Sequence, residues 1–392
     1  MPFTPEAGER AMRVHEVILR GVSGELSWLQ VADILGRSPR SIRRLRWRFE
    51  HQGYEGLYDG RRVKPSPRRV PVAEVERILR LYRERYPGFN GRHFYQLARR
   101  EHAVGLSYTF VKRLLQHAGL LSKHRARGRH RRRREPRPCF GELLHLDGSR
   151  HAWLALVPDT RPTLLAVVDD ATKQLLYAQL VPGGESVVAI MTALRAVLEI
   201  YGLPMALYTD RASWAVYTPT SGTDPDRRRL TQVGRALQRL GIEHILGYSP
   251  QARGRSERVN RTLQDRLVNE LRVAGIRTLA AANRYLRDRF VPAFNAEFGR
   301  PPADPTAAFV PLGGADLDEI LCHEELRTVA PDNTVCLAGV RLQIAKQRGR
   351  RTCAGLQVVI RRYLQGTHAV WWGTRCLGRY SPTGQPLACA VA

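Results

Sequence analysis

The chain has 392 residues, with 63 lysines and arginines against 36 aspartates and glutamates, and a formal net charge of +27 at pH 7. Its length accommodates two to four domains, and 43% hydrophobic residues are enough for a sizeable core. No apolar run approaches the roughly 18–20 residues that span a bilayer, and the N-terminal segment lacks the apolar centre of a signal peptide. These properties disfavour a membrane protein and predict a polyanionic partner, above all nucleic acid, and a cytoplasmic location.

A helix-turn-helix pattern lies within the first predicted domain, residues 1–60. Apolar residues recur at helical spacing at Leu29, Ala32 and Leu35, "GRSP" breaks the helix, and a second helix starts with Ser38 as N-cap and Pro39 at its first position. The inward face of this second helix would carry Ile42, Leu45 and Phe49. Its outward face would carry the candidate DNA-binding residues Arg40, Ser41, Arg43, Arg44 and Arg48. The pattern predicts that the second helix enters the major groove; a helical hairpin with a solvated basic face is the alternative.

A second helix-turn-helix-like domain is predicted over residues 61–121. It begins with the Pro- and Arg-rich stretch "GRRVKPSPRRVP", which is typical of a linker. Three helices are predicted to follow, over "VAEVERILRLYRERY", "NGRHFYQLARREH" and "SYTFVKRLLQHAGL". Two such domains in tandem would cover a longer DNA site than one.

A basic linker is predicted over residues 122–139. Its stretch "SKHRARGRHRRRREPRP" holds nine lysines and arginines against one glutamate, so it cannot bury itself. Its arginine run, with Arg131, Arg132, Arg133 and Arg134, is a candidate to follow the DNA backbone and release its counterions. A merely solvated tether is the alternative.

Residues 140–312 have the composition of a globular α/β domain. Strands are predicted over "ELLHLDGSRHAWLAL" and on both sides of "DDATKQ", followed by alternating helices and strands that end in the long helix "GRSERVNRTLQDRLVNELRVAG". Three leading strands would form an antiparallel meander, and the strands that follow helices would join it in parallel. This order predicts a ribonuclease H-like fold with a mixed five-stranded sheet.

Three acidic residues stand at the ends of these elements. Asp147 ends the first strand, Asp210 ends the fourth, and Glu257 opens the long helix. Because the first and fourth strands are neighbours in the predicted sheet, the three carboxylates are expected to converge. Their like charges would repel unless a metal is bound, and hard oxygen ligands suit Mg²⁺ or Mn²⁺. The cluster therefore predicts phosphoryl transfer on a phosphodiester with two divalent ions, attacked by water or a DNA 3′-hydroxyl.

The sequence of the long helix predicts one polar face and one apolar face. Asn260, Arg261 and Gln264 share the face of Glu257. A second stripe, Val259, Leu263, Leu267 and Leu271, is expected to face the sheet. The candidate phosphate contacts around Glu257 are Arg253, Arg255, Asn260 and Arg261. In the alternative, Glu257 is a surface residue that only pairs with Arg253 or Arg261.

Other polar residues compete for the same role. Asp169 and Asp170 lie in a turn, where an aspartate more often binds backbone amides. The insertion "YTPTSGTDPDRRR" also contains aspartates and is expected to be a flexible surface segment. His151 and Trp153 follow Asp147 closely, and core packing and a role at the site are equally compatible with them.

The C-terminal residues 313–392 show alternating apolar and polar residues with Gly-rich breaks, as in "TVCLAGVRLQIAK" and "HAVWWGTRCLGRY". This alternation predicts a small β-barrel-like domain. Its many arginines make it basic as well.

The chain resembles insertion-sequence transposases of the DDE class, within the retroviral-integrase-like superfamily, and is most similar to the ISNCY group. The stretches that carry this resemblance are "ELLHLDGSRHAW", "LLAVVDDAT", "ALYTDRAS", "LTQVGRALQRLGIEHI", "SPQARGRSERVNRTLQDRLVNELR" and "AGIRTLAAANRYL". The resemblance departs from the superfamily in two ways. The insertion lengthens the segment between Asp210 and Glu257, and the His/Cys zinc module of retroviral integrases is absent; none of the six cysteines forms a CxxC pair.

The resemblance implies a transposase of the bacterial cytoplasm, associated with the nucleoid. Asp147, Asp210 and Glu257 would be the acidic triad that binds Mg²⁺ or Mn²⁺ and supports cleavage at the element ends and joining of the 3′-hydroxyls to target DNA. The N-terminal domains would bind the terminal inverted repeats of double-stranded DNA, and at least a dimer would hold two ends. Two alternatives stay open: a non-catalytic DNA-binding regulator derived from a transposase, and a ribonuclease H-type nuclease.

Overall fold

The computed structural model describes residues 5–58, 70–122, 135–219, 226, 228–247 and 256–387, and the side chains of residues 5–7, 256 and 257 lie outside the description. The chain divides into two compact units, Met1–Leu79 and Arg80–Ala392. Within the described ranges, none of the helices combines the length and the apolar character that crossing a membrane requires.

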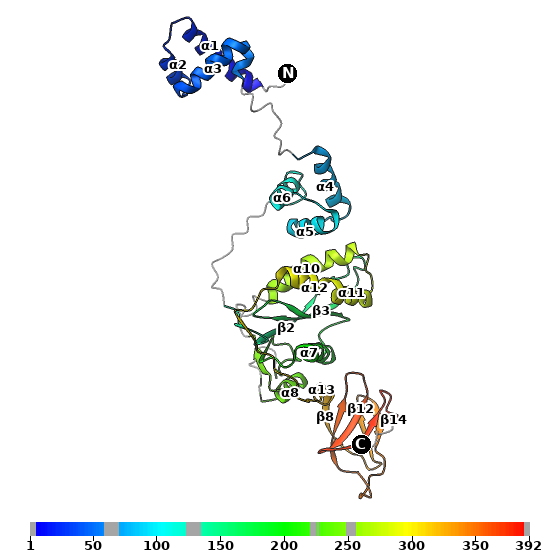
Figure 1. Ribbon diagram of the computed structural model, residues 1–392. Helices are drawn as coiled ribbons and strands as arrows, with labels where there is room; N and C mark the ends of the chain where they lie inside the picture. The colour runs from blue at the N-terminus through cyan, green and yellow to red at the C-terminus, as the bar shows by residue number, and fades with distance from the viewer. Residues whose placement is uncertain are drawn as a thin grey trace. The chain divides into compact units, whose positions relative to one another are not determined.

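The first unit is helical, with α1 (Pro5–Val22), α2 (Trp28–Ile34), α3 (Pro39–Gln52), the 3-10 turn η1 (Gly53–Leu57) and the start of α4 (Val72–Glu84) (Figure 1). The predicted helix start is confirmed: Ser38 caps α3 by accepting a hydrogen bond from the Ser41 amide, and Pro39 is its first residue. Ile42 and Leu45 are buried, as predicted, but Leu29 is 67% exposed. Of the predicted apolar residues around α2, Ala32 is buried and Leu35 packs against the core, and Val31 takes the inward place predicted for Leu29.

The central sheet of the second unit confirms the predicted ribonuclease H order. It contains β2 (Leu143–Arg150), β3 (Thr163–Asp169), β4 (Leu175–Val181), β5 (Ala206–Thr209) and β6 (Glu243–Leu246), arranged β4-β3-β2-β5-β6. The β2–β3 and β3–β4 pairs are antiparallel, whereas β5 joins β2 and β6 joins β5 in parallel. A short parallel pair, β1 (Cys139–Phe140) with β7 (Asp304–Ala307), lies outside this sheet.

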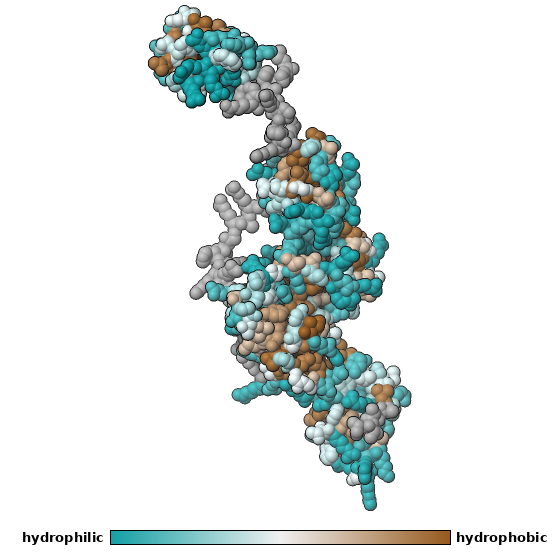
Figure 2. All heavy atoms as spheres, viewed as in Figure 1, coloured by the Kyte–Doolittle hydropathy of each residue, from teal (hydrophilic) through white to brown (hydrophobic). Residues whose placement is uncertain are grey.

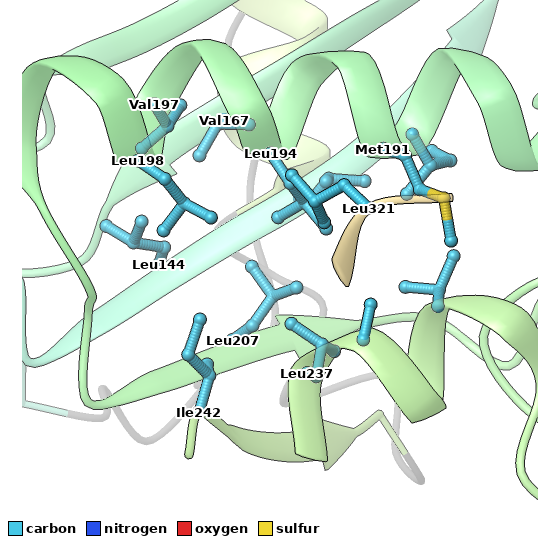
Figure 3. Packing of buried hydrophobic residues seen from close by; sticks show 14 of the residues in the cluster. Leu144, Val167, Met191, Leu194, Val197, Leu198, Leu207, Leu237, Ile242 and Leu321 are labelled. Carbon is cyan, nitrogen blue, oxygen red and sulfur yellow. The ribbon is translucent and has the colours of Figure 1, made fainter. Parts of the chain in front are cut away.

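Helices cover both faces of the sheet (Figure 1). One face packs on α7 (Val187–Tyr201) and α8 (Gln232–Arg239), where Leu144, Val167, Leu194 and Leu237 are among the buried side chains drawn in Figure 3. The other face packs on α10 (Ser256–Val273), α11 (Leu279–Tyr285), the π turn η2 (Leu286–Phe290) and α12 (Val291–Phe298). Strand β3 is buried along its whole length because both layers cover it.

The apolar stripe of α10 is confirmed, since Leu263, Leu267 and Leu271 have no exposed surface. Each fully buried leucine contributes roughly 1.5–3 kcal/mol relative to an exposed one. These side chains pack with Leu164 and Ala166 of β3. The stripe therefore fixes the rotation of α10 about its axis, and with it the direction of the polar face that begins at its N-terminus.

Two further helices of the second unit, α5 (Gly91–His102) and α6 (Tyr108–His117), precede the sheet in the chain. Helix α5 contacts α10 and α12 through polar groups. His93, only 2% exposed, lies 2.9 Å from Glu270 through its Nε2 atom. The Gln96 amide donates to the Glu297 carboxylate at 2.5 Å, and the Asn90 amide donates to Asp265. These polar contacts connect α5 to α10 and α12.

Five of the C-terminal strands lie in the stretches where apolar and polar residues alternate, and two, at residues 323–328 and 386–387, lie outside them. The C-terminal strands are β8 (His323–Thr328), β9 (Thr334–Leu337), β10 (Val340–Gln343), β11 (Gln357–Arg362), β12 (His368–Trp372), β13 (Arg375–Tyr380) and β14 (Pro386–Leu387). Five form a sheet ordered β14-β13-β12-β11-β8, and β9 and β10 form a hairpin that shares its core. The barrel-like domain itself remains a prediction.

A charged network links these strands to the helices beside the central sheet. Arg361 of β11 bonds Glu324 at 2.9 Å and also pairs with Glu319 of the short helix α13 (Leu317–Ile320). Arg235 and Arg239 of α8 reach Glu324 from the other side, at 3.4 and 2.8 Å. Glu324 is therefore shared between the central layer and the C-terminal sheet.

Candidate functional site

The site begins with the register of two parallel strands. In the β2–β5 pair, His145 is the partner of Tyr208. Two residues further on come Asp147, within β2, and Asp210, which directly follows the last residue of β5. Side chains two residues apart in a strand point to the same face of a sheet. The parallel register therefore brings both residues to the point where β5 ends. The prediction that Asp147 ends its own strand is wrong, because pairing with β3 carries β2 on to Arg150.

The charge of Asp210 acts on Asp147. Burial is the main cause that raises the pKa of Asp147 to about 6, and the negative charges of Asp210 and Glu185 raise it further. A hydrogen bond from the Asn260 amide, 2.8 Å from the Asp147 Oδ2 atom, acts in the opposite direction. Ionisation of the Asp147 carboxyl is therefore energetically unfavourable in the folded protein, and a bound cation would stabilise the ionised form.

The polar face of α10 meets β2 at this edge. Asn260 donates to Asp147, and one turn later Gln264 donates to the Ser149 hydroxyl at 2.9 Å. Asn260, predicted to contact DNA, therefore has a protein partner. Glu257 is the second residue of α10, three positions before Asn260, but its side chain lies outside the described residues. The convergence of the third carboxylate with the other two remains a prediction.

Asp210 is oriented by the segment that follows it. Its Oδ1 atom accepts a hydrogen bond from the Ala212 amide at 2.9 Å. Two residues later, the Trp214 indole donates to the Glu185 Oε2 atom at 2.5 Å. Burial raises the pKa of Glu185; the Trp214 bond lowers it and the charge of Asp210 raises it. No sequence pattern distinguishes Glu185, because an acidic residue at the start of a helix is common.

The remaining acidic candidates have structural roles. Asp169 accepts from the Gly141 and Thr172 amides, and Asp170 accepts from the Arg137 amide. Both are buried, so their predicted role as backbone acceptors is confirmed. Trp153 is likewise a core residue with no exposed surface, and its indole donates to the Ser149 carbonyl.

The predicted DNA-binding arginines of α3 lie on one surface. Arg40, Arg43, Arg44 and Arg48 line a hollow of about 600 Å³, and Ser41 is exposed beside them. Trp47 also lines the hollow and is 55% exposed. No pattern in the sequence had indicated this residue as part of the surface. Hydrophilic residues cover much of the visible face of this unit (Figure 2).

The other predicted contact residues are less defined. Arg261 is exposed on α10. Outside the described residues lie Arg131, Arg132, Arg133, Arg134, Arg253 and Arg255. Their part in DNA binding remains a prediction.

The donors at the sheet edge suit a hard divalent cation, because they are carboxylate oxygens whose charges oppose one another. Among the side chains that the structure describes, no three histidines, cysteines, aspartates or glutamates meet as a metal-binding group. Asp147 and Asp210 therefore need a further ligand. The carboxylate of Glu257, on the helix that contacts Asp147, is the candidate for it.

Comparison with known proteins gives two related sequences. A protein of Sinorhizobium fredii named "Putative transposase y4bF" is 31% identical over 366 residues, which cover 93% of this chain and 79% of that protein. The "Transposase for insertion sequence IS1202" of Streptococcus pneumoniae is 31% identical over 300 residues, which cover 68% of this chain and 63% of that protein. No protein-family model matches the chain.

Two solved structures illustrate the structural comparison. The catalytic core domain of BIV integrase covers 38% of this chain and 85% of its own, with a TM-score of 0.27 and 19% identity. The simian T-cell lymphotropic virus intasome in complex with PP2A regulatory subunit B56 gamma covers 73% and 93%, with a TM-score of 0.31 and 13% identity. The strand order β4-β3-β2-β5-β6, and not similarity to these structures, defines the fold of the central sheet.

Proposed function

The chain belongs to the insertion-sequence transposases of the retroviral-integrase-like superfamily, and from this premise we propose that it cleaves DNA at the ends of its element and joins the freed 3′-hydroxyls to target DNA in a reaction that depends on divalent metal. The observation that carries the proposal is the register of β2 and β5, which brings Asp147 and Asp210 to one edge of the sheet. The Asn260 bond to Asp147 supports it, because the start of α10 then lies at the same edge.

Asp147, Asp210 and Glu257 hold Mg²⁺ or Mn²⁺ in this proposal. When bound, two such ions activate the attacking oxygen and stabilise the leaving oxygen of a phosphodiester. The protein's own groups orient the ligands: Asn260 holds one oxygen of Asp147, and the Ala212 amide holds one oxygen of Asp210. Arg261, Arg253 and Arg255 would bind the neighbouring phosphates.

The DNA-binding part of the proposal rests on α3. Its arginines and Trp47 form a basic surface on a helix whose turn and caps match a helix-turn-helix. We assign this surface to the terminal inverted repeats, residues 61–121 to an adjacent part of the same DNA, and the arginines of residues 122–139 to the backbone. The basic C-terminal strands are a further DNA-contacting candidate. Because two element ends react together, at least two protomers would assemble on DNA.

Strand transfer by the full-length protein tests the assignment. With Mg²⁺ and labelled terminal-repeat duplexes, the wild-type protein should release and join 3′ ends. Asp210→Asn should abolish joining and leave duplex binding intact, because it removes a metal ligand and no DNA contact. Asp159→Asn, at an exposed loop position, is the matched control and should leave both unchanged. Joining that survives Asp210→Asn would remove the proposed mechanism.

Binding competition separates this function from the ribonuclease alternative. Helix-turn-helix units read the major groove of duplex DNA, whereas the deep, narrow groove of A-form helices excludes them. Duplex DNA should therefore displace a labelled terminal repeat more effectively than an RNA–DNA hybrid of the same sequence. A preference for the hybrid would favour the nuclease alternative.

A further inference from the structure

Glu185 connects three elements that border the candidate site. It immediately precedes Ser186, the N-cap of α7, and its carboxylate is part-buried. The Trp214 indole, in the segment after β5, donates to its Oε2 atom at 2.5 Å. Its other oxygen lies over Gly148 of β2, next to Asp147, so closely that a Cβ atom at position 148 would overlap it. The absence of a side chain at Gly148 makes room for this carboxylate.

The contact to Trp214 continues to Asp210. Trp214 is 5% exposed and packs in the core beneath α7. It lies in a tight turn in which the Ala215 and Val216 amides both donate to the Ala212 carbonyl, at 2.8 and 3.1 Å. The amide of Ala212 in turn donates to the Asp210 Oδ1 atom. Glu185 therefore anchors the turn that orients Asp210.

Direct metal ligation by Glu185 is a weaker explanation of the same geometry. One of its oxygens is already bound by the indole. Within the described part of the chain, Glu185 forms no three-ligand group with Asp147 and Asp210. Its Oε1 atom lies against Gly148 of β2, and its Oε2 atom accepts from Trp214 in the turn after β5.

We infer that Glu185 is a positioning residue for the proposed reaction: through Trp214 and the Ala212 amide, it holds the Asp210 carboxylate in the orientation that metal binding requires. Gly148 has the complementary role of leaving space for it. This inference rests on the proposed function and adds a residue outside the acidic triad. Substitutions that break the chain of contacts should weaken metal binding through Asp210, even though they leave every proposed ligand in place.

Three substitutions separate the roles of charge and hydrogen bonding. Glu185→Gln keeps an acceptor for the indole and removes the charge, Glu185→Ala removes both, and Trp214→Phe removes the donor and keeps most of the aromatic bulk. Glu199→Ala, at an exposed position of the same helix α7, is the matched control. Loss of an outer-shell partner typically weakens metal affinity or activity about 10–100-fold. We expect a loss of this size in Glu185→Ala and Trp214→Phe, and a much smaller one in Glu185→Gln.

Two quantities are measured. The first is the affinity of the full-length protein for Mn²⁺, determined by electron paramagnetic resonance, and the second is the Mn²⁺ concentration that half-saturates strand transfer. In the double variant Glu185→Ala/Trp214→Phe the loss should equal that of the worse single variant, because both act through one contact. A purely structural role would lower the melting temperature and leave Mn²⁺ affinity unchanged, which would overturn the inference. A loss in Glu185→Gln as large as in Glu185→Ala would also overturn it, in favour of direct ligation.

The two proposals fail in different ways. If wild-type protein binds Mn²⁺ but joins no DNA, the proposed function fails, and the Mn²⁺ affinities of the variants still decide the role of Glu185. If wild-type protein joins DNA and Glu185→Ala binds Mn²⁺ normally, only the positioning role fails. A wild-type protein that binds no Mn²⁺ would overturn both.

Discussion

Asp147→Asn should stabilise the metal-free protein at neutral pH. The folded-state pKa of Asp147 is about 6, against an ordinary value of 3.8, so the difference is about 2 pH units. At about 1.4 kcal/mol per unit, the ionised carboxylate costs the folded state roughly 3 kcal/mol. Because Asp147 is not fully buried, we expect a gain of about 1–3 kcal/mol. Asparagine keeps an oxygen that can accept the hydrogen bond from Asn260.

The pH dependence follows from the sign of the shift. A raised pKa means that the folded state binds the proton more tightly than the unfolded state does, so stability falls as pH rises from about 4 to about 6. Below pH 4 the carboxyl is protonated in both states and the cost disappears; above pH 6 the cost is complete. The advantage of Asp147→Asn should therefore be present at pH 7.5 and largely lost at pH 4.5.

Thermal unfolding of the full-length protein in a metal chelator measures this effect. For a cooperative unit of 150–250 residues, a range that includes the predicted domain of residues 140–312, 1 kcal/mol corresponds to about 2–4 °C. The unfolding transition of that domain should therefore rise by several degrees at pH 7.5. Asp159→Asn, which removes an exposed carboxylate, serves as the control and should not change it. An equal gain at both pH values, or none at pH 7.5, would refute the argument from buried charge.

Three further outcomes are expected. Excess Mg²⁺ should raise the melting temperature of the wild-type protein but not of Asp147→Asn, because a ligand stabilises only the state that binds it; an equal rise in both would contradict the metal assignment. Arg361→Met should destabilise the protein by about 1–3 kcal/mol in urea unfolding, since it removes the cation that Glu319 and Glu324 share. The loss stays below that of a fully unpaired buried charge, because Arg235 and Arg239 still pair with Glu324 and Arg379 with Glu319. Arg44→Ala should reduce the slope of log affinity against log salt for duplex DNA by about 0.9, whereas Arg46→Ala should not, because Arg46 pairs with Glu50.

The sheet and its two aspartates could be predicted because the information is local. Alternating apolar and polar residues mark the strands, and apolar residues at helical spacing together with N-caps mark the helices. The order of these elements along the chain then permits few arrangements of the sheet. Asp210 then falls just after the end of its strand, as predicted, whereas Asp147 lies within β2 because pairing with β3 extends that strand to Arg150. The apolar stripe of α10, which includes Leu263, similarly indicated which side of that helix faces the sheet.

What the sequence did not indicate depends on contacts between distant segments. Glu185 resembles an ordinary acid at a helix start, and its proximity to Gly148 exists only in the folded sheet. Trp47 interrupts a basic face, and its exposure depends on how α3 packs. The polar pairs between α5 and α10, such as His93 with Glu270, join residues far apart in the chain, and neither partner has a pattern of its own.

The contact between α5 and α10 restricts where a nucleic acid could approach residues 91–117. The amino end of a helix attracts anions because its first amides are unbonded, but at α5 the Asn90 cap is bound to the carboxylate of Asp265. A DNA phosphate at that end would meet the negative charge of Asp265, which lines the same hollow as Asn90 and Gly91. Helix α6 exposes the cations Lys112 and Arg113, so its surface is more favourable to a polyanion than the amino end of α5.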